Sequence, residues 1–261
     1  MSPGCHPNEG TPYSSLPSRP RWCGGGLERY GERRSVLYAV LKVLIDRLVL
    51  GIWRPRVEGL ENLPRTGPVI VASNHLSFID SILIPLICPR RVAFLAKEEY
   101  WTTPGLKGRF MKGFFTGIGA VPVRRGDNRA AQEALDTALH VVESGIAFGI
   151  YPEGTRSRDG KLYRARVGVG WLALKSKAPV VPVGLSGTNE VLPVGAKFPK
   201  FKRITVRFGE PIMAADIEFP GEAVAENSRA RRAVADAIVA EIGKLSGQEY
   251  TGVYNERPAE V

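Results

Sequence analysis

The sequence predicts an α/β fold, with a largely parallel central sheet flanked by helices. Two patterns support this prediction. Short β-rich runs alternate with helical runs through most of the chain, and this alternation is typical of strands joined by crossover helices. Some of the β-rich runs are also apolar without interruption, as in Gly67–Ser73 (GPVIVAS), which indicates a strand buried on both faces.

We expect four parts along the chain. Residues 1–34 are rich in Pro, Gly, Ser and Arg and have no apolar core segment, so they predict a disordered tail and no signal peptide. An N-terminal helix is expected over residues 35–56 and the α/β domain over residues 57–246. Residues 247–261 are expected to form a loose C-terminal tail.

The N-terminal helix is the most apolar segment, but Lys42, Asp46 and Arg47 interrupt it. A helix that spans a bilayer needs about 20 mostly apolar residues with few charges. Because the three charges lie close together on a helical wheel, we expect an amphipathic membrane-associating helix with Trp53 near the interface. A helix packed on the domain's own core remains the alternative, and a full span fits the pattern least.

The elements of the domain follow from local patterns. Helix 127–144 is the most regular, because its apolar residues share one face, Asp127 or Asn128 can cap it, and Gly145 can end it. The predicted strands are Gly67–Ser73, Val92–Ala96, Ala120–Val123, Ala147–Tyr151, Val180–Gly184 and Ile204–Phe208. The predicted helices are Ser77–Ile87, a Gly- and Phe-rich stretch between residues 96 and 120, Asp127–Ser144, Ala165–Lys177 and Arg229–Leu245.

The composition indicates a globular protein with an anionic partner. Hydrophobic residues make up 44% of the chain, and the formal net charge is +10. Such a charge suits nucleic acid, an anionic membrane or a phosphorylated substrate, and does not choose among them. The three cysteines show no metal-ligand spacing, which argues against a disulfide framework or a metal site and fits a reducing compartment.

The first segment with chemical potential is Ser73–Asp80 (SNHLSFID). A predicted strand ends at His75, and in open α/β sheets ligands bind at the carboxyl ends of strands. Asp80 falls in the first turn of the next helix, where its carboxylate can orient the imidazole and stabilise the imidazolium. A base and its orienting carboxylate without a serine nucleophile suit the activation of a substrate alcohol.

A structural role explains the same residues. Ser77 and Asp80 have the S-x-x-D spacing of a helix cap, and His75 could be a satisfied structural histidine. These residues alone leave both interpretations open. Of the other histidines, His6 falls in the predicted tail and His140 in the middle of a helix, so His75 is the best placed base.

The second segment is Tyr151–Arg158 (YPEGTRSR), directly after an apolar strand. Gly154 lets the backbone approach a ligand, Thr155 offers a hydroxyl, and Arg156 can fork onto a phosphate. Glu153 can orient an arginine or accept a hydrogen bond from a substrate hydroxyl. The alternative is a polar turn with solvated arginines.

The two segments resemble motifs of the glycerolipid acyltransferase family. Its first motif is N-H-x4-D and its third is F-P-E-G-T-R-S, matched here by Asn74–Asp80 and by Tyr151–Ser157 with Tyr for the usual Phe. Gly119–Arg125 resembles the second motif, with Arg124 for the usual Asp. Val180–Val183 resembles the fourth, and the resemblance covers about residues 59–211.

The resemblance implies a function and a set of roles. His75 would be the general base and Asp80 its partner. The fatty acyl chain would pass from acyl-CoA or acyl carrier protein to the sn-2 hydroxyl of 1-acylglycerol 3-phosphate, giving phosphatidic acid. This thioester would be a co-substrate, with no metal and no cofactor. The residues expected to bind the acceptor are Lys97, Arg125, Glu153, Gly154, Thr155 and Arg156.

A lipid acceptor also implies a membrane partner. Leu106–Phe115 and Lys197–Arg203 combine cations with large apolar residues, and both suit an anionic phospholipid surface. A solvated basic face with core aromatics is the alternative, and it suits the first segment better than the second. We expect a peripheral or monotopic protein at the cytoplasmic face of the cell membrane.

Three other functions compete with this interpretation. The enzyme could use another acceptor, such as glycerol 3-phosphate, another lysophospholipid or a glycolipid. The same fold could also serve a non-catalytic lipid-binding protein, although the intact motifs argue against that. A nucleic-acid-binding module would share the basic charge, but no nucleic-acid motif is visible and no nucleic-acid partner is expected.

Overall fold

The computed structural model describes residues 51–117, 119–123, 128–196, 198–219 and 221–256. The predicted tail over residues 1–34 lies outside these ranges, as does the predicted N-terminal helix except for its last residues. Within that helix, Gly51–Trp53 are helical. No helix among the described residues has the length and apolar character needed to cross a membrane.

The core of the domain is a seven-stranded sheet in the order β1-β7-β6-β2-β5-β3-β4. Every neighbouring pair is parallel except β6 and β7, which are antiparallel. The predicted α/β fold with a largely parallel sheet is therefore confirmed. The strands are β1 (Arg56–Glu58), β2 (Val69–Ser73), β3 (Val92–Lys97), β4 (Val121–Val123), β5 (Ala147–Ile150), β6 (Val180–Ser186) and β7 (Thr205–Phe208).

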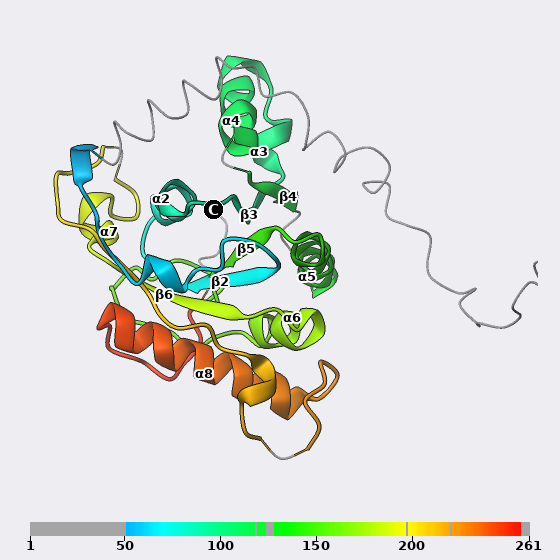
Figure 1. Cartoon of the computed structure of the whole chain (residues 1–261). Coiled ribbons are helices and arrows are strands. Elements are labelled where there is room, and N and C mark those ends of the chain that lie inside the picture. Colours follow the sequence, from blue (N-terminus) through cyan, green and yellow to red (C-terminus); the bar gives the residue numbers. More distant parts are fainter. Residues whose placement is uncertain (1–50, 118, 124–127, 197, 220, 257–261) are drawn as a thin grey trace, which may run out of the picture. The chain divides into compact units, whose positions relative to one another are not determined.

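Helices cover both faces of this sheet (Figure 1). Side chains alternate along β2, so Ile70 and Ala72 pack with α5, α6 and α8, whereas Val69 and Val71 pack with α2. All five residues of β2 are buried, as expected for a central strand covered on both sides. The helices are η2 (Leu60–Asn62), α2 (Asp80–Ile87), α3 (Glu99–Thr102), α4 (Gly105–Gly117), α5 (Asn128–Glu143), α6 (Gly168–Ser176), α7 (Thr188–Val191), η3 (Ala214–Asp216) and α8 (Ser228–Ser246).

The structure differs from the sequence prediction at short or non-local elements. β1 was not predicted, because its three residues have no apolar run and are held as a strand by pairing with β7 far along the chain. The short helix α7 was also missed. Helix α2 starts at Asp80 rather than at about Ser77, because the preceding backbone is turned onto the Asp80 carboxylate.

The C-terminal segment, residues 247–256, is not the loose tail that we expected. Backbone N–H groups of Leu162 and Arg164 donate to the carbonyls of Glu249 and Val253, and Thr251 N–H donates back to the Leu162 carbonyl. The segment was mispredicted because its composition is polar and its order comes from backbone pairing with a distant loop. Residues 257–261 lie outside the described part of the chain.

Close packing of α6 on α8 predicts a stability effect at Gly170. A Cβ at this position would collide with the backbone carbonyl of Arg231 in α8, and backbone cannot move aside as a flexible side chain can. Gly170→Ala should therefore lower the free energy of unfolding by about 1–3 kcal/mol. The measurement is the denaturant midpoint by circular dichroism.

Gly113→Ala in α4 is the matched control, because nothing lies within 4 Å of a Cβ placed there. The control should be neutral or raise stability by up to about 1 kcal/mol through helix propensity. Equal midpoints for the two variants would contradict the packing described for α6 and α8.

Candidate active site

The sheet topology brings the two sequence segments to one edge. β2 and β5 are parallel neighbours with Ala72 opposite Ile150, and β3 lies on the other side of β5. The carboxyl ends of parallel strands share an edge, so the residues that follow β2 and β5 meet there. His75 follows β2, the 151–158 loop follows β5, and Lys97 ends β3.

His75 and Asp80 form a direct pair at this edge. Nδ1 of His75 lies 2.9 Å from Oδ2 of Asp80. The same oxygen accepts the backbone N–H groups of Leu76 and Ser77, each at 2.7 Å. One carboxylate oxygen therefore both holds the turn before α2 and faces the imidazole ring.

The pair has one enclosed and one accessible member. The Asp80 side chain is completely buried, whereas that of His75 is 15% exposed. Nε2 of His75 has no hydrogen-bond partner among the described residues. With Nδ1 facing the carboxylate, Nε2 is the nitrogen that can accept a proton from a bound molecule.

The loop after β5 forms hydrogen bonds with both the N–H and the carbonyl of His75. The N–H of His75 donates to Oε1 of Glu153 at 3.0 Å, and its carbonyl accepts the N–H of Ser157 at 2.7 Å. The second oxygen of Glu153 accepts the N–H of Tyr163 at 3.0 Å. The Glu153 residue is 1% exposed, and both its oxygens are engaged by backbone, so its carboxylate does not point at the exposed side of the site.

Burial raises the pKa of Glu153 to about 7, and the two backbone hydrogen bonds oppose this shift. The negative charges of Asp80 and Asp159 raise the pKa further. The fold therefore holds a carboxyl group that changes charge near neutral pH directly behind His75.

Tyr151 packs face to face on the imidazole of His75. The ring centroids are 3.8 Å apart and the planes differ by 8°. The Tyr151 hydroxyl shares a 2.9 Å hydrogen bond with Oγ of Ser81, the residue after Asp80 in α2. In the sequence Tyr151 stands out only as a departure from a motif, because its contact with His75 arises from the register of two distant strands.

Asn74, next to His75, anchors the end of β2. Its side-chain Nδ2 donates to the carbonyl of Leu185, and its Oδ1 accepts the Leu185 N–H at 2.7 Å. Nδ2 also donates to Oε1 of Gln248 at 2.6 Å, and Gln248 donates to the carbonyl of Gly160 at 2.7 Å. The C-terminal segment is thereby tied to β2 and to the loop after β5, which no local pattern could reveal.

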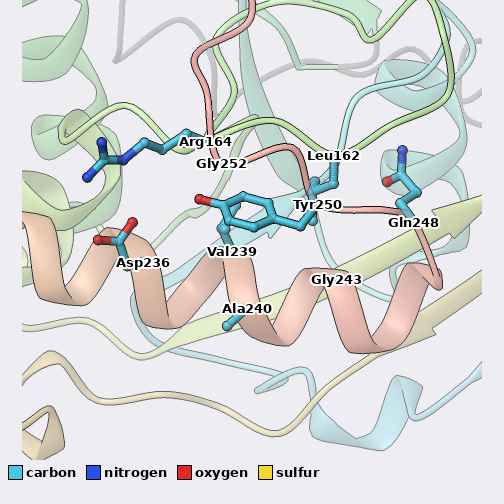
Figure 2. A pocket seen from close by; sticks show the side chains of 9 residues that line it. All are labelled: Leu162, Arg164, Asp236, Val239, Ala240, Gly243, Gln248, Tyr250 and Gly252. Atoms are coloured by element: carbon cyan, nitrogen blue, oxygen red, sulfur yellow. The ribbon is translucent and has the colours of Figure 1, made fainter.

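A hollow lies between the C-terminal segment and α8, and Figure 2 shows the Tyr250 ring lying over the helix there. None of the predicted site residues lines it. It is bordered by Leu162, Arg164, Asp236, Val239, Ala240, Gly243, Gln248, Tyr250 and Gly252.

Two predicted cations, Arg156 after β5 and Lys97 at the end of β3, lie at the same edge of the sheet as His75. Arg156 is exposed, and its guanidinium has no partner among the described residues, while its backbone carbonyl accepts a hydrogen bond from Asn255. Lys97 is half-buried at the end of β3. Arg125 lies outside the described residues. The described residues contain no cluster of His, Cys, Asp or Glu side chains arranged to hold a metal ion.

Two further predicted residues lie in the loop after β5. Gly154 is exposed and has φ of +78°, a conformation that favours glycine. A Cβ there would press against the side chain of Arg166. Thr155 is half-buried beside it.

Comparison with known proteins decides the family. The sequence model of the acyltransferase family matches residues 54–186. This stretch is about half of the 261-residue chain and contains every predicted site residue from His75 to Arg156. The chain belongs to the acyltransferase family. Helix α8 and the C-terminal segment lie beyond the matched stretch.

Individual relatives share a name. The chain is 31% identical over 171 residues to a chloroplastic 1-acyl-sn-glycerol-3-phosphate acyltransferase of Brassica napus, covering 65% of this chain and 47% of that protein. It is 29% identical over 163 residues to the 1-acyl-sn-glycerol-3-phosphate acyltransferase of Bacillus subtilis, covering 62% and 75%. The chain spans about half the length of the first of these relatives.

A solved structure is similar over most of the chain. The crystal structure of the 1-acyl-sn-glycerophosphate acyltransferase of Thermotoga maritima matches with a TM-score of 0.58 and 26% sequence identity. The match covers 84% of this chain and 86% of that one. The arrangement of strands and helices is therefore shared with an acyltransferase of known structure.

The raised pKa of Glu153 predicts a pH-dependent stability. Because the folded pKa of about 7 lies above the ordinary value of 4.5, the folded protein binds this proton more tightly than the unfolded chain. The contribution is complete below about pH 4.5 and is lost as the pH rises through about 7. Relative to Glu153→Gln, the wild type should lose about 3 kcal/mol of unfolding free energy over this range.

Urea denaturation of both proteins from pH 4 to pH 8 measures this difference. Subtracting the variant removes the other groups that titrate in the same range. A difference between the two proteins that stays constant with pH would show that Glu153 keeps an ordinary pKa in the folded state.

Proposed function

We propose that this protein is a 1-acyl-sn-glycerol-3-phosphate O-acyltransferase. It transfers a fatty acyl chain from acyl-CoA or acyl carrier protein to the sn-2 hydroxyl of 1-acylglycerol 3-phosphate and forms phosphatidic acid. The observation that carries the proposal is the 2.9 Å contact between His75 Nδ1 and Asp80 Oδ2, which leaves Nε2 facing outward at a sheet edge with cations. The names of the relatives support the choice of acceptor.

His75 acts as the general base in the proposed reaction. As the acceptor oxygen attacks the thioester carbonyl carbon, its proton passes to Nε2 of His75. Asp80 stabilises the imidazolium that forms. The carbon–sulfur bond then breaks, and the imidazolium returns the proton to the departing sulfur. The products are an ester and a free thiol, and the reaction needs no metal and no cofactor beyond the thioester co-substrate.

The acceptor's phosphate is bound by cations at the same edge. The exposed guanidinium of Arg156 can form two parallel hydrogen bonds to phosphate oxygens. Lys97 and Arg125 add positive charge, and Gly154 and Thr155 line the approach. Glu153 positions His75 and the loop instead of touching the acceptor, because both of its oxygens accept backbone N–H groups.

The proposed site opens toward a membrane surface of anionic phospholipids. α4 follows β3, and the loop over residues 192–203 follows β6 and α7, so both leave the sheet at the edge that holds His75. Ser77 in the His75 turn donates to the carbonyl of Leu192 at the start of this loop. The two segments therefore lie on the side from which a lipid would enter.

Exposed apolar side chains and cations occur together on both segments. Leu106 is 84% exposed and Phe110 is 75% exposed on α4, whereas Phe115 is buried, so this helix divides between core and surface. In the loop, Phe198 and Phe201 are each 80% exposed. Lys200, Lys202 and Arg203 beside them are exposed. Rings that dip into the interface beside cations suit an anionic leaflet, at the cytoplasmic face of the cell membrane as we propose.

The catalytic proposal predicts a severe loss at His75. Thiol release from palmitoyl-CoA with lysophosphatidate should fall about 10²–10⁴-fold in His75→Ala, because the variant lacks the imidazole that would take the proton. His140→Ala is the control, since that side chain is 63% exposed on α5. Arg156→Ala should raise the KM for lysophosphatidate and leave the KM for palmitoyl-CoA unchanged. Wild-type activity in His75→Ala would remove His75 from the mechanism.

The membrane proposal predicts a separate effect of the loop phenylalanines. The double variant Phe198→Ser/Phe201→Ser should bind phosphatidylglycerol vesicles at least about tenfold more weakly. The reason is that it loses the favourable transfer of two apolar rings from water into the membrane interface. Turnover of a water-soluble short-chain substrate should be retained. Val224→Ser, also at an exposed apolar side chain, is the control. Unchanged sedimentation of the double variant with vesicles would contradict docking through this loop.

A further inference from the structure

The contact between Tyr151 and His75 has a consequence for the base. The single hydrogen bond to Asp80 fixes the direction of Nδ1, and the flat stacking at 3.8 Å fixes the plane of the ring. Together they determine where Nε2 points. The face of an aromatic ring also carries negative electrostatic potential, which attracts a cation above it. The imidazolium formed during proton transfer is such a cation.

Tyr151 is itself held in place by two neighbouring elements. Its hydroxyl shares a hydrogen bond with Ser81, in the same helical turn that carries Asp80. Its ring also stacks with Phe94 of β3, with centroids 5.3 Å apart. Phe94 reaches this position because its partner in β5 is Gly149, where any Cβ would collide with the phenylalanine ring. The stacking surface beneath His75 is therefore built from α2, β3 and β5.

The Tyr151 hydroxyl does not take part in proton transfer. Burial and the nearby negative charge of Asp80 raise the pKa of Tyr151 well above its ordinary value, so the phenol stays neutral. Its hydroxyl is engaged with Ser81, away from the exposed face of His75. The ring supplies the interaction with the imidazole, and the hydroxyl supplies the attachment to α2.

We propose that Tyr151 is a positioning residue for the base: its ring holds the His75 imidazole in plane and stabilises the imidazolium, and its bond to Ser81 holds the ring. This inference rests on the proposed role of His75 as general base. It predicts that the ring at position 151 matters to turnover, and that the hydroxyls of Tyr151 and Ser81 matter as a pair.

The experiment compares Tyr151→Leu, Tyr151→Phe, Ser81→Ala and the double variant Tyr151→Phe/Ser81→Ala. Tyr151→Leu should lower kcat roughly tenfold, with the KM for lysophosphatidate within about twofold, because the stacking orients the base and becomes stronger when the imidazolium forms. Ser81→Ala leaves the half-buried phenol without its partner and should lower kcat about threefold. The double variant removes both polar groups and should recover most of that loss.

A spectroscopic readout separates positioning from general destabilisation. A ring stacked on an imidazole shifts the imidazole carbon-bound protons upfield in the NMR spectrum. This shift should persist in Tyr151→Phe and vanish in Tyr151→Leu. Tyr250→Leu is the control, because that ring lies over α8 and lines the separate hollow in Figure 2. It should change neither the shift nor kcat.

Each outcome has one meaning. A normal kcat in Tyr151→Leu, while His75→Ala is inactive, overturns this inference and leaves the proposed function standing. An inactive wild type, or an active His75→Ala, overturns the proposed function and this inference together. If Tyr151→Leu does not fold, Ser81→Ala and the double variant decide: equal kcat values for Ser81→Ala and wild type overturn the role of the Tyr151–Ser81 bond.

Discussion

The candidate site depends on the hydrogen bonds that the carboxylate of Asp80 accepts. One of its oxygens accepts three hydrogen bonds, from the imidazole of His75 and from the backbone of Leu76 and Ser77. A buried charge is costly without donors, and these three donors to Oδ2 matter all the more because Oδ1 is buried with no hydrogen-bond partner among the described residues. The start of α2, the turn after β2 and the direction of the imidazole are therefore set by the same group. Holding the turn and orienting the imidazole are therefore one constraint, because the same oxygen of Asp80 does both.

The order of the strands in the sheet also constrains the position of His75. Because β2 and β5 are parallel neighbours, the loop after β5 reaches His75, where Glu153 and Ser157 bond its N–H and its carbonyl. The C-terminal segment then secures that loop through Gln248 and Asn255. The loop after β5 thus fixes the backbone of His75, and Asp80 in α2 fixes the direction of Nδ1. Tyr151 fixes the plane of the imidazole ring. Such preorganisation suits a base that must receive a proton without rearrangement.

The parts of this arrangement that depend on neighbouring residues could be predicted from the sequence. The continuous apolar run of β2 predicted a buried strand, and the spacing of His75 and Asp80 gave a pair at its end as one of two open interpretations. The parts that depend on distant pairing were not readable. β1 is a strand only because β7 lies beside it, and the C-terminal segment is ordered by backbone bonds to Leu162 and Arg164. Glu153 looked like a group for a ligand because it adjoins arginines, yet its partners are backbone N–H groups that have no sequence signature.

The most direct test of the account is the protonation pattern of the neutral His75 ring, measured by two-bond ¹H–¹⁵N NMR on protein labelled at its histidines. His75→Ala identifies its signals among those of the three histidines. We expect Nδ1 to carry the proton and face Asp80, with Nε2 unprotonated and able to accept one. A ring protonated at Nε2 would contradict it, because neither the hydrogen bond to Asp80 nor the base at the exposed edge would then exist as described.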